Sequence, residues 1–348
     1  MDTAGANAPI GFLRFGWSPQ AFHRLSALVT LFILIIIFAF GNASFLTLGN
    51  GMTVLLQTTV IGLLGIGMTM VIITGGIDLS VGSVLALAGT VTGMLVKAGV
   101  PVVPAMIIGV GVGALCGLLN GLIITRLRLP PFIVTLGTLS IFGALNTWYS
   151  NSETIRSQDM QAAAPFLLWL GKLFKPYDIV AAFGLDMPFL KGWVVTYGSV
   201  LMIVLAIILS YVLSRTAFGR HVYATGDDPD AARLSGINTD RTLVAVYALA
   251  GFICAIGAWA FIGRVGGVSP QAGLTLNLDS ITAVVIGGTS LFGGRGSIVG
   301  TLFGALIVGV FRNGLALSGL ALLWQDFAVG VLIILAVTID QWIRKISA

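Results

Sequence analysis

The sequence predicts an all-α polytopic membrane protein, and three observations carry the prediction. The chain of 348 residues is 57% hydrophobic but only 9% charged, whereas a soluble globular protein carries about 25% charged residues. Only Asp78 and Lys97 are charged between Leu25 and Thr125, an interval that holds about four spans of roughly 20 apolar residues. The 46 glycines suit helices that approach closely in a membrane. Continuous apolar runs favour helices over a β-barrel, whose strands alternate in polarity.

The apolar runs give the order of about ten transmembrane helices. Residues 1–24 form an N-terminal tail with Arg14 and Arg24, and no cleavage-like site precedes the first span, which argues against a signal peptide. Residues 25–348 form the transmembrane domain. Its expected spans are 25–43, 52–74, 81–98, 102–125, 131–150, 196–214, 242–263, 277–292, 297–317 and 320–342.

Lysine and arginine set the orientation, because they accumulate on the cytoplasmic side of a membrane. An even number of spans with both termini cytoplasmic places these residues inside: Arg126, Arg128, Arg215, Arg220, Arg233, Arg241, Arg295, Arg344 and Lys345. Outside lie Lys97, Arg264, Arg312 and the segment 151–195, whose charges are mixed in sign. An odd number of spans would leave one basic cluster outside. The net charge of +5 follows from this placement, and no nucleic-acid partner is expected.

The outer segment 151–195 is too long for a simple turn. It contains a short apolar piece, Ala164–Leu170, and we expect short interfacial helices with Trp169 and Trp193 at the depth of the lipid headgroups. Two alternatives stay open for the segment: a packed outer cap, or a docking surface for a partner.

The stretch TGGIDLSVGS at 74–83 places an acid between two spans. Gly75 and Gly76 break a helix, and Asp78 or Ser80 can cap the next one. A carboxylate near membrane depth is costly unless it faces water, a partner or a freed backbone N–H. Asp78 is therefore either a helix cap or part of a translocation pathway or its gate. The candidate pathway residues are Thr74, Asp78, Ser80 and Ser83, with Gln57 and Asn120 as polar neighbours.

A second glycine-rich stretch follows at 286–297. Its Gly293-Gly294 pair precedes Gly300 by the same offset by which Gly75-Gly76 precedes Gly82. Transporters often carry internal duplications, and the matching offset hints at one here. Arg295 is taken as a marker of the inner boundary of the membrane.

The loop 215–241 contains GDDPDAARLSGIN, a charged island between apolar runs. Asp228 suits the N-cap, Pro229 the N1 position and Gly236 the C′ position of a helix of about two turns. Such a helix is too short to be stable alone, so it must pack against its own membrane domain or another subunit. A docking helix explains this capping better than a solvated loop does. Its candidate contact residues are Asp227, Asp228, Asp230, Ala231, Ala232, Arg233 and Gly236.

Several activities are not supported by the sequence. No G-x-x-x-x-G-K-[ST] motif is present, so no ATP site is expected in this chain. Cys116 and Cys254 lie in apolar runs without metal or redox spacing, and we expect buried packing residues. His23 and His221 lie at predicted cytoplasmic ends, and no nucleophile–base pair is recognisable. We therefore expect neither an enzyme nor a metal or cofactor site in this chain.

Three stretches together resemble a known family: TGGIDLSVGS at 74–83, GRHVYATGDDPDAARLSGIN at 219–238 and AVVIGGTSLFGGRGSIVGTLFGALIVG at 283–309. They are similar to ribose-type permease subunits of bacterial ABC sugar importers, and the resemblance runs from about Leu46 to Lys345. Within that family, PPFIVTLG at 130–137 and ETIRSQD at 153–159 are most similar to the fructose-type permease.

The resemblance implies a homodimeric pore in the bacterial inner membrane. It also implies a cytoplasmic ATPase subunit that holds ATP and Mg, and a periplasmic sugar-binding protein. Asp230-Ala231-Ala232 followed by Gly236 resembles the Glu-Ala-Ala…Gly coupling loop of importer permeases, with Asp in place of Glu.

These inferences together predict the permease subunit of an ATP-driven importer of fructose or a ribose-like sugar, in contact with membrane lipid. The loaded binding protein is expected to dock through Glu153, Arg156, Asp159 and Arg264. The alternative is a secondary sugar transporter that works alone. It would need substrate and ion sites at the membrane midplane, for which only Asp78 with Gln57 and Asn120 is available.

Overall fold

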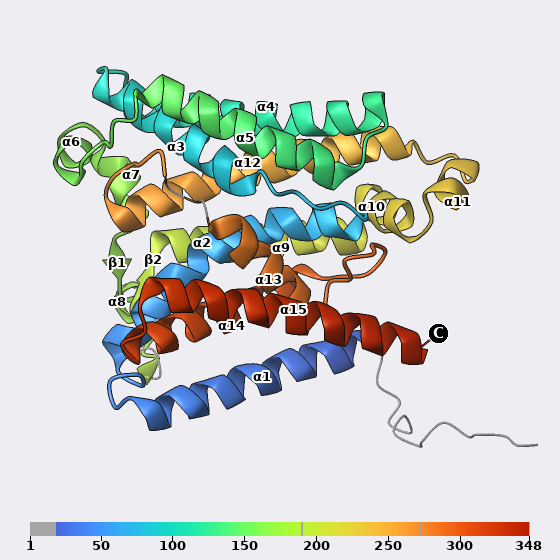
Figure 1. Ribbon diagram of the computed structural model, residues 1–348. Helices are drawn as coiled ribbons and strands as arrows, with labels where there is room; N and C mark the ends of the chain where they lie inside the picture. The colour runs from blue at the N-terminus through green and yellow to red at the C-terminus, as the bar shows by residue number, and fades with distance from the viewer. Residues whose placement is uncertain (1–18, 189–190, 272, 274, 348) are drawn as a thin grey trace, which may run out of the picture.

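The computed structural model describes residues 19–347, except 189, 190, 272 and 274 (Figure 1). Most of the predicted N-terminal tail, 1–24, therefore lies outside the described residues. Long helices run side by side through the bundle, and shorter elements gather at its two ends (Figure 1).

The all-α prediction is confirmed for the long elements. The apolar helices are α1 (Pro19–Gly41), α2 (Leu48–Ile73), α3 (Val81–Lys97), α4 (Val102–Leu127), α5 (Pro131–Ser150), α9 (Tyr197–Arg215), α12 (Thr239–Val265), α13 (Leu276–Ile286), α14 (Ile298–Leu317) and α15 (Leu322–Ser347). In the described part of the chain, six of them are long and apolar enough to cross a membrane: α2, α4, α5, α9, α12 and α14. Shorter apolar segments are Ala27–Gly41, Val81–Lys97, Leu276–Ile286 and Leu322–Thr338.

The predicted span 277–292 is too long. Helix α13 has 11 residues, or about 16 Å, against the roughly 30 Å of a hydrocarbon core. It ends at Ile286 because Gly288 adopts the left-handed conformation (φ +85°). The N–H of Thr289 then donates to the carbonyl of Val284 at 3.1 Å, which closes a glycine-dependent helix end.

The segment 151–195 folds into short elements, as expected. These are α6 (Ser157–Ala163), α7 (Pro165–Trp169), β1 (Leu173–Phe174), α8 (Pro176–Ala182) and β2 (Val195–Thr196). The two strands pair antiparallel, with Leu173 opposite Thr196. The rings of Trp169 and Tyr197 stack with their centroids 3.6 Å apart, so the segment is held against the start of α9.

The two ends of the bundle differ. One end, called here the α6 end, carries α6, α7 and the small sheet. The other, the α11 end, carries α10 (Ala217–Asp227) and α11 (Pro229–Leu234) (Figure 1). Helix α12 joins the two ends with 27 residues, about 40 Å. Helix α1 begins and α15 ends on the side where α11 lies (Figure 1).

The packing order repeats within the chain. Helix α4 packs along α12 as α14 packs along α2, and α3 lies against α4 and α12 as α13 lies against α14 and α2. Helix α2 ends at the α11 end, where α12 begins (Figure 1), so the repeat is inverted. The structure thus supports an internal duplication, but in another register than the glycine offset indicates. By packing order, residues 74–80 correspond to 266–275 rather than to 286–297.

Glycines permit the closest of these helix contacts. A β-carbon on Gly117 of α4 would overlap the carbonyl oxygen of Tyr247 in α12, and one on Gly251 would overlap the carbonyl oxygen of Gly113. The backbones of α4 and α12 therefore meet directly, as small residues allow in membrane proteins. Both cysteines are buried and unpaired in this core, as predicted.

Candidate functional site

Helix α11 is capped at its N-terminus by Asp228, as the sequence predicts. The Asp228 Oδ1 accepts the backbone N–H of Asp230 at 2.9 Å and that of Ala231 at 3.0 Å. Pro229 occupies the first helical position, where its missing N–H costs nothing. The backbone donors that a short helix leaves unpaired are therefore satisfied by one side chain.

Gly236 ends α11, also as predicted. Its φ of +84° is left-handed, which glycine adopts without strain. The N–H of Gly236 donates to the carbonyl of Arg233 at 2.9 Å, and the N–H of Ile237 donates to that of Ala232 at 3.0 Å. This pair of bonds is the Schellman arrangement, so both ends of a six-residue helix are fixed by local bonds.

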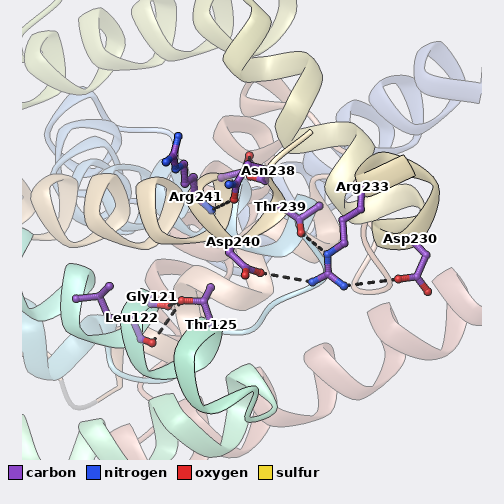
Figure 2. Close-up of polar contacts among 10 residues, drawn as sticks. Gly121, Leu122, Thr125, Asp230, Arg233, Asn238, Thr239, Asp240 and Arg241 are labelled. Carbon is purple, nitrogen blue, oxygen red and sulfur yellow. Dashed lines mark hydrogen bonds and ion pairs between the residues drawn. The ribbon is translucent and has the colours of Figure 1, made fainter. Parts of the chain in front are cut away.

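Arg233 ties α11 to the first turn of α12 (Figure 2). Its Nε donates to the Thr239 Oγ1 at 2.8 Å, and its guanidinium lies 3.4 Å from the Asp240 carboxylate and 3.6 Å from that of Asp230. Because these side chains are exposed, each ion pair contributes at most about 1 kcal/mol. Asn238 caps α12 by accepting the N–H of Arg241 at 2.9 Å. The position of α11 is thus linked to that of a helix that runs the length of the bundle.

The predicted contact residues of this helix separate into two groups. Ala232 is buried at 4% exposure against its own domain, whereas the others are exposed: Asp227, Asp228, Asp230, Ala231, Arg233 and Gly236. The sequence reasoning did not single out Leu234, which is 90% exposed at the C-terminal end of α11. A large aliphatic side chain on a polar helix was the available signal for it.

Asp78 is buried at 3% exposure in the connection between α2 and α3. Its Oδ1 accepts the backbone N–H of Ser80 at 2.8 Å and the Ser80 hydroxyl at 2.6 Å. The Asn120 side-chain amide in turn donates to the Ser80 Oγ at 2.9 Å. This chain of bonds fixes the connection to α4. The N-cap residue of α3 is Ser80, and its side chain makes no cap bond. Asp78 instead holds the N–H of Ser80 just before the helix, which favours a structural role over a pathway role.

The remaining candidate pathway residues do not converge on Asp78. Thr74 donates to the carbonyl of Val71 at 2.7 Å, and Ser83 donates to that of Leu139 at 3.0 Å, which ties α3 to α5. Gln57 lies on α2, 16 residues before its last residue, Ile73, or about 24 Å along the helix. The structure therefore brings Asn120 to Asp78 but places Gln57 toward the other end of α2.

The four predicted docking residues lie at the α6 end. Glu153 forms an ion pair with Lys97 of α3. Arg156 lines a hollow of about 500 Å³ together with Ser157, Phe261, Val265 and Gln271. Asp159 is exposed in the first turn of α6, and Arg264 is exposed in the last turn of α12.

The floor of this hollow is defined by a backbone bridge. Ile155 and Val268 exchange two hydrogen bonds, of 2.9 and 3.0 Å, and both side chains are buried. The segment after α5 and the segment after α12 are thus held together beside the last turn of α12, which carries Arg264.

The sequence reasoning missed a buried group of charges. Arg312, predicted to lie outside, has a side chain only 15% exposed, and its guanidinium bonds the Asp279 carboxylate at 2.7 and 2.9 Å. It also reaches the Asp326 carboxylate at 3.0 Å. Arg312 lies five residues before Leu317, where α14 ends, so its placement on the outer side stays a prediction. Two carboxylates, on α13 and α15, compensate its charge within the bundle. The signal was available, since three successive apolar stretches each contain one charged residue that needs a partner.

Within the described residues, no three His, Cys, Asp or Glu side chains gather in a way that could hold a metal ion. The candidate site consists of capped, hydrogen-bonded contacts. It contains an exposed short helix at one end of the bundle and a charged hollow at the other.

Comparison with known proteins finds relatives over most of the chain. Residues 50–337 match the family model described as the branched-chain amino acid transport system permease component. The chain is 49% identical to the fructose import permease protein of Rhizobium meliloti over 94% of this chain and 88% of that one. It is 39% identical to the ribose import permease protein of Bacillus subtilis over 94% of each chain, and 36% identical to that of Escherichia coli K12 over 90% of this chain and 92% of that one. No solved structure matches.

The resemblance read from the three motifs is thereby confirmed, and with it the prediction that the chain is not an enzyme. The chain belongs to the family of branched-chain amino acid transport system permease components, and it is a multi-pass protein of the bacterial inner membrane.

Proposed function

We propose that this chain is the membrane-spanning subunit of an ATP-driven monosaccharide importer. The observation that carries the proposal is α11, a short helix capped at both ends that presents exposed side chains at one end of the bundle. Such a short helix adds little to the stability of its own domain. Its construction makes sense as a contact for another subunit that supplies energy, because this sequence has no phosphate-binding loop.

The topology proposed is about ten spans with both termini in the cytoplasm. It puts α11 in the cytoplasm and the segment 151–195 in the periplasm. The basic residues Arg215, Arg220, Arg233 and Arg241 flank or lie within the α10–α11 region, which agrees with the cytoplasmic excess of positive charge.

The proposed partners are a second copy of this chain, a cytoplasmic ATPase that binds ATP and Mg, and a periplasmic sugar-binding protein. The exposed face of α11 would receive the ATPase. Leu234 would be its apolar anchor, with Asp227, Asp228, Asp230 and Ala231 around it. Ala232, Arg233 and Gly236 would hold the helix in position, since their main contacts are within this chain.

The loaded binding protein would dock at the α6 end. Arg156 and Arg264 there suit acidic side chains on the partner, and the hollow of about 500 Å³ beside Arg156 gives room for a protruding loop. Glu153 and Asp159 would add charges of the opposite sign and fix the orientation of the complex.

The pathway for sugar is proposed to lie between two copies of the chain. Buried Asp78, Ser80 and Asn120 would then shape the connection that moves when the pathway opens, rather than contact sugar. The relatives include permeases named for fructose, ribose, D-allose and xylose. Fructose is the first sugar to test, because the 49% identity is to a fructose permease.

The test is uptake of labelled sugar into proteoliposomes that contain this chain, its ATPase and its binding protein. Uptake should require ATP, and Leu234→Asp should abolish it and weaken retention of the ATPase on the purified membrane subunit. Leu185→Asp is the matched control, since Leu185 is 54% exposed in the segment 151–195, outside the predicted spans and away from α11. Ion-driven sugar uptake by this chain alone would contradict the proposal and favour a secondary transporter.

A further inference from the structure

Three connections that are far apart in sequence meet beside α11. They are the end of α2 at Ile73, the end of α10 at Gly226, and the loop between α13 and α14 at Gly294. The N–H of Gly294 donates to the carbonyl of Ile73 at 2.9 Å. A β-carbon on Gly226 would overlap that same carbonyl oxygen and lie 2.8 Å from the Gly294 nitrogen. The three backbones are therefore in direct contact, and we call this contact the glycine junction.

Two further contacts join the same segments. The Tyr223 hydroxyl of α10 donates to the carbonyl of Gly296 at 2.8 Å. A β-carbon on Gly294 would lie 2.9 Å from the Asp227 carboxylate, so this loop also packs on the residue that precedes the α11 cap. The end of α10 is thus attached to the loop 287–297 at two places separated by a full helical turn.

The junction also includes the glycine pair that breaks α2. A β-carbon on Gly293 would lie 2.5 Å from the Gly226 carbonyl oxygen and 3.0 Å from the Gly75 nitrogen. Gly75 opens the connection that contains Asp78. The contacts of Gly226 and Gly293 are with backbone atoms, so no flexible side chain lies between these segments to absorb a displacement. Close-packed groups of this kind transmit strain.

The position of the junction connects it to α11. Asp227 ends α10 and Asp228 caps α11, so only these two residues separate Gly226 of the junction from the first residue of the docking helix. On the other side lie the connection 74–80, which leads to the buried Asp78, and the loop 287–297, which leads to α14. Both are irregular segments inside or at the edge of the bundle, and both follow helices that end in left-handed glycines, Gly75 and Gly288.

We propose that Gly226, with Tyr223 and Gly294, forms the positioning contact through which movement of α11 reaches the connections 74–80 and 287–297. The inference rests on the proposed function, in which α11 receives an ATPase. At the glycine junction, one movement of α11 displaces both connections at once. Each connection belongs to a different half of the inverted repeat.

Tyr223→Phe is the first test, because it removes one hydroxyl and leaves the packing intact. The complete transporter is reconstituted, and three quantities are measured: retention of the ATPase, sugar uptake, and ATP hydrolysis stimulated by the sugar-loaded binding protein. ATPase retention should be unchanged, while uptake should fall by about three- to tenfold, as loss of one partly buried hydrogen bond implies. The number of ATP molecules hydrolysed per sugar should rise. Tyr211→Phe, at a 64% exposed tyrosine of α9, is the control and should leave all three unchanged.

Gly226→Ala is the second test, because it forces the three backbones apart. Alanine favours a helix over glycine, so a loss of coupling would not come from weakening α10 itself. Gly111→Ala is the matched control, since Gly111 lies in helix α4 with nothing within 4 Å of its β-carbon position. Stimulated ATP hydrolysis should no longer depend on the loaded binding protein in Gly226→Ala. If this variant does not assemble, Tyr223→Phe alone decides.

The two proposals can fail separately. The glycine junction is overturned as the transmitting contact if Tyr223→Phe and Gly226→Ala assemble and keep the parental uptake and ATP-to-sugar ratio. This holds even where Leu234→Asp still releases the ATPase. Parental uptake in Leu234→Asp with full ATPase retention would instead overturn the assignment of α11, on which the junction depends.

Discussion

The guanidinium of Arg312 on α14 holds the carboxylate of Asp279 on α13 at 2.7 Å, within the helix bundle. Asp326 on α15 bonds the same guanidinium at 3.0 Å, so one arginine joins the last three helices. The side chains of Asp279 and Asp326 differ in exposure, at 4% and 40%. Removal of Asp279 therefore deprives Arg312 of its buried partner, whereas removal of Asp326 leaves that partner in place. This difference gives the first prediction.

Asp279→Ala should destabilise the protein by about 3 to 5 kcal/mol, the usual cost of removing one partner of a buried ion pair. Asp326→Ala should cost about 1 kcal/mol, since its carboxylate is partly exposed and Arg312 keeps its buried partner. Thermal unfolding in detergent, compared with the exposed control Asp178→Ala, measures both. Equal losses for the two substitutions would show that the buried contact does not dominate.

Asp78→Asn should leave transport within about twofold of the parent, because asparagine caps backbone N–H groups nearly as well as aspartate. Its side-chain oxygen can accept the same two bonds from Ser80. Asp78→Ala should lower stability by roughly 1 to 3 kcal/mol, since the buried donors lose their acceptor.

Uptake by proteoliposomes and thermal unfolding separate the two roles of Asp78. A severe transport loss in Asp78→Asn with normal assembly would assign the carboxylate to the pathway. Asp178→Asn, at an exposed aspartate outside the proposed docking residues, is the control and should change neither quantity.

Much of the end carrying α11 could be predicted from sequence because its structure is local. Asp228, Pro229 and Gly236 each satisfy a requirement set by the two or three neighbouring residues, and the structure confirms all three. The same holds for the helix break at Gly75 and Gly76. The order of the long helices could also be predicted, because an apolar run of about 20 residues is long enough to identify a membrane-spanning helix.

The remaining features depend on contacts between distant segments. The partners of Arg312 lie 33 residues before it and 14 after it, and hydropathy gives no information on which charged residues pair. The expectation that Gln57 neighbours Asp78 is wrong for a related reason, because the polarity of a residue says nothing of its position along a helix. The glycine junction joins residues 73, 226 and 294, and no pattern within any one stretch reveals that meeting.

Gly236→Val should reduce transport strongly. A β-branched side chain at φ +84° costs at least about 1 kcal/mol, and it disrupts the Schellman bonds that end α11. Gly236→Asn should be much milder, because asparagine tolerates the left-handed conformation. Uptake measured for both variants, with ATPase retention as a second readout, tests the capping. Equal activity of the two variants would mean that the conformation of Gly236 is not needed for coupling.

Arg156→Glu should raise the concentration of loaded binding protein needed for half-maximal uptake by about tenfold, with the maximal rate kept. Reversal of a charge at the rim of an interface mainly changes encounter and its salt dependence. The effect should therefore shrink at high ionic strength, where the screening length falls to roughly 3 Å at 1 M salt. Lys172→Glu, in the same segment 151–195 but outside the set of proposed docking residues, is the control and should have a smaller effect. A loss of maximal rate with unchanged half-saturation would instead place Arg156 in a step after docking, because binding itself would then be intact.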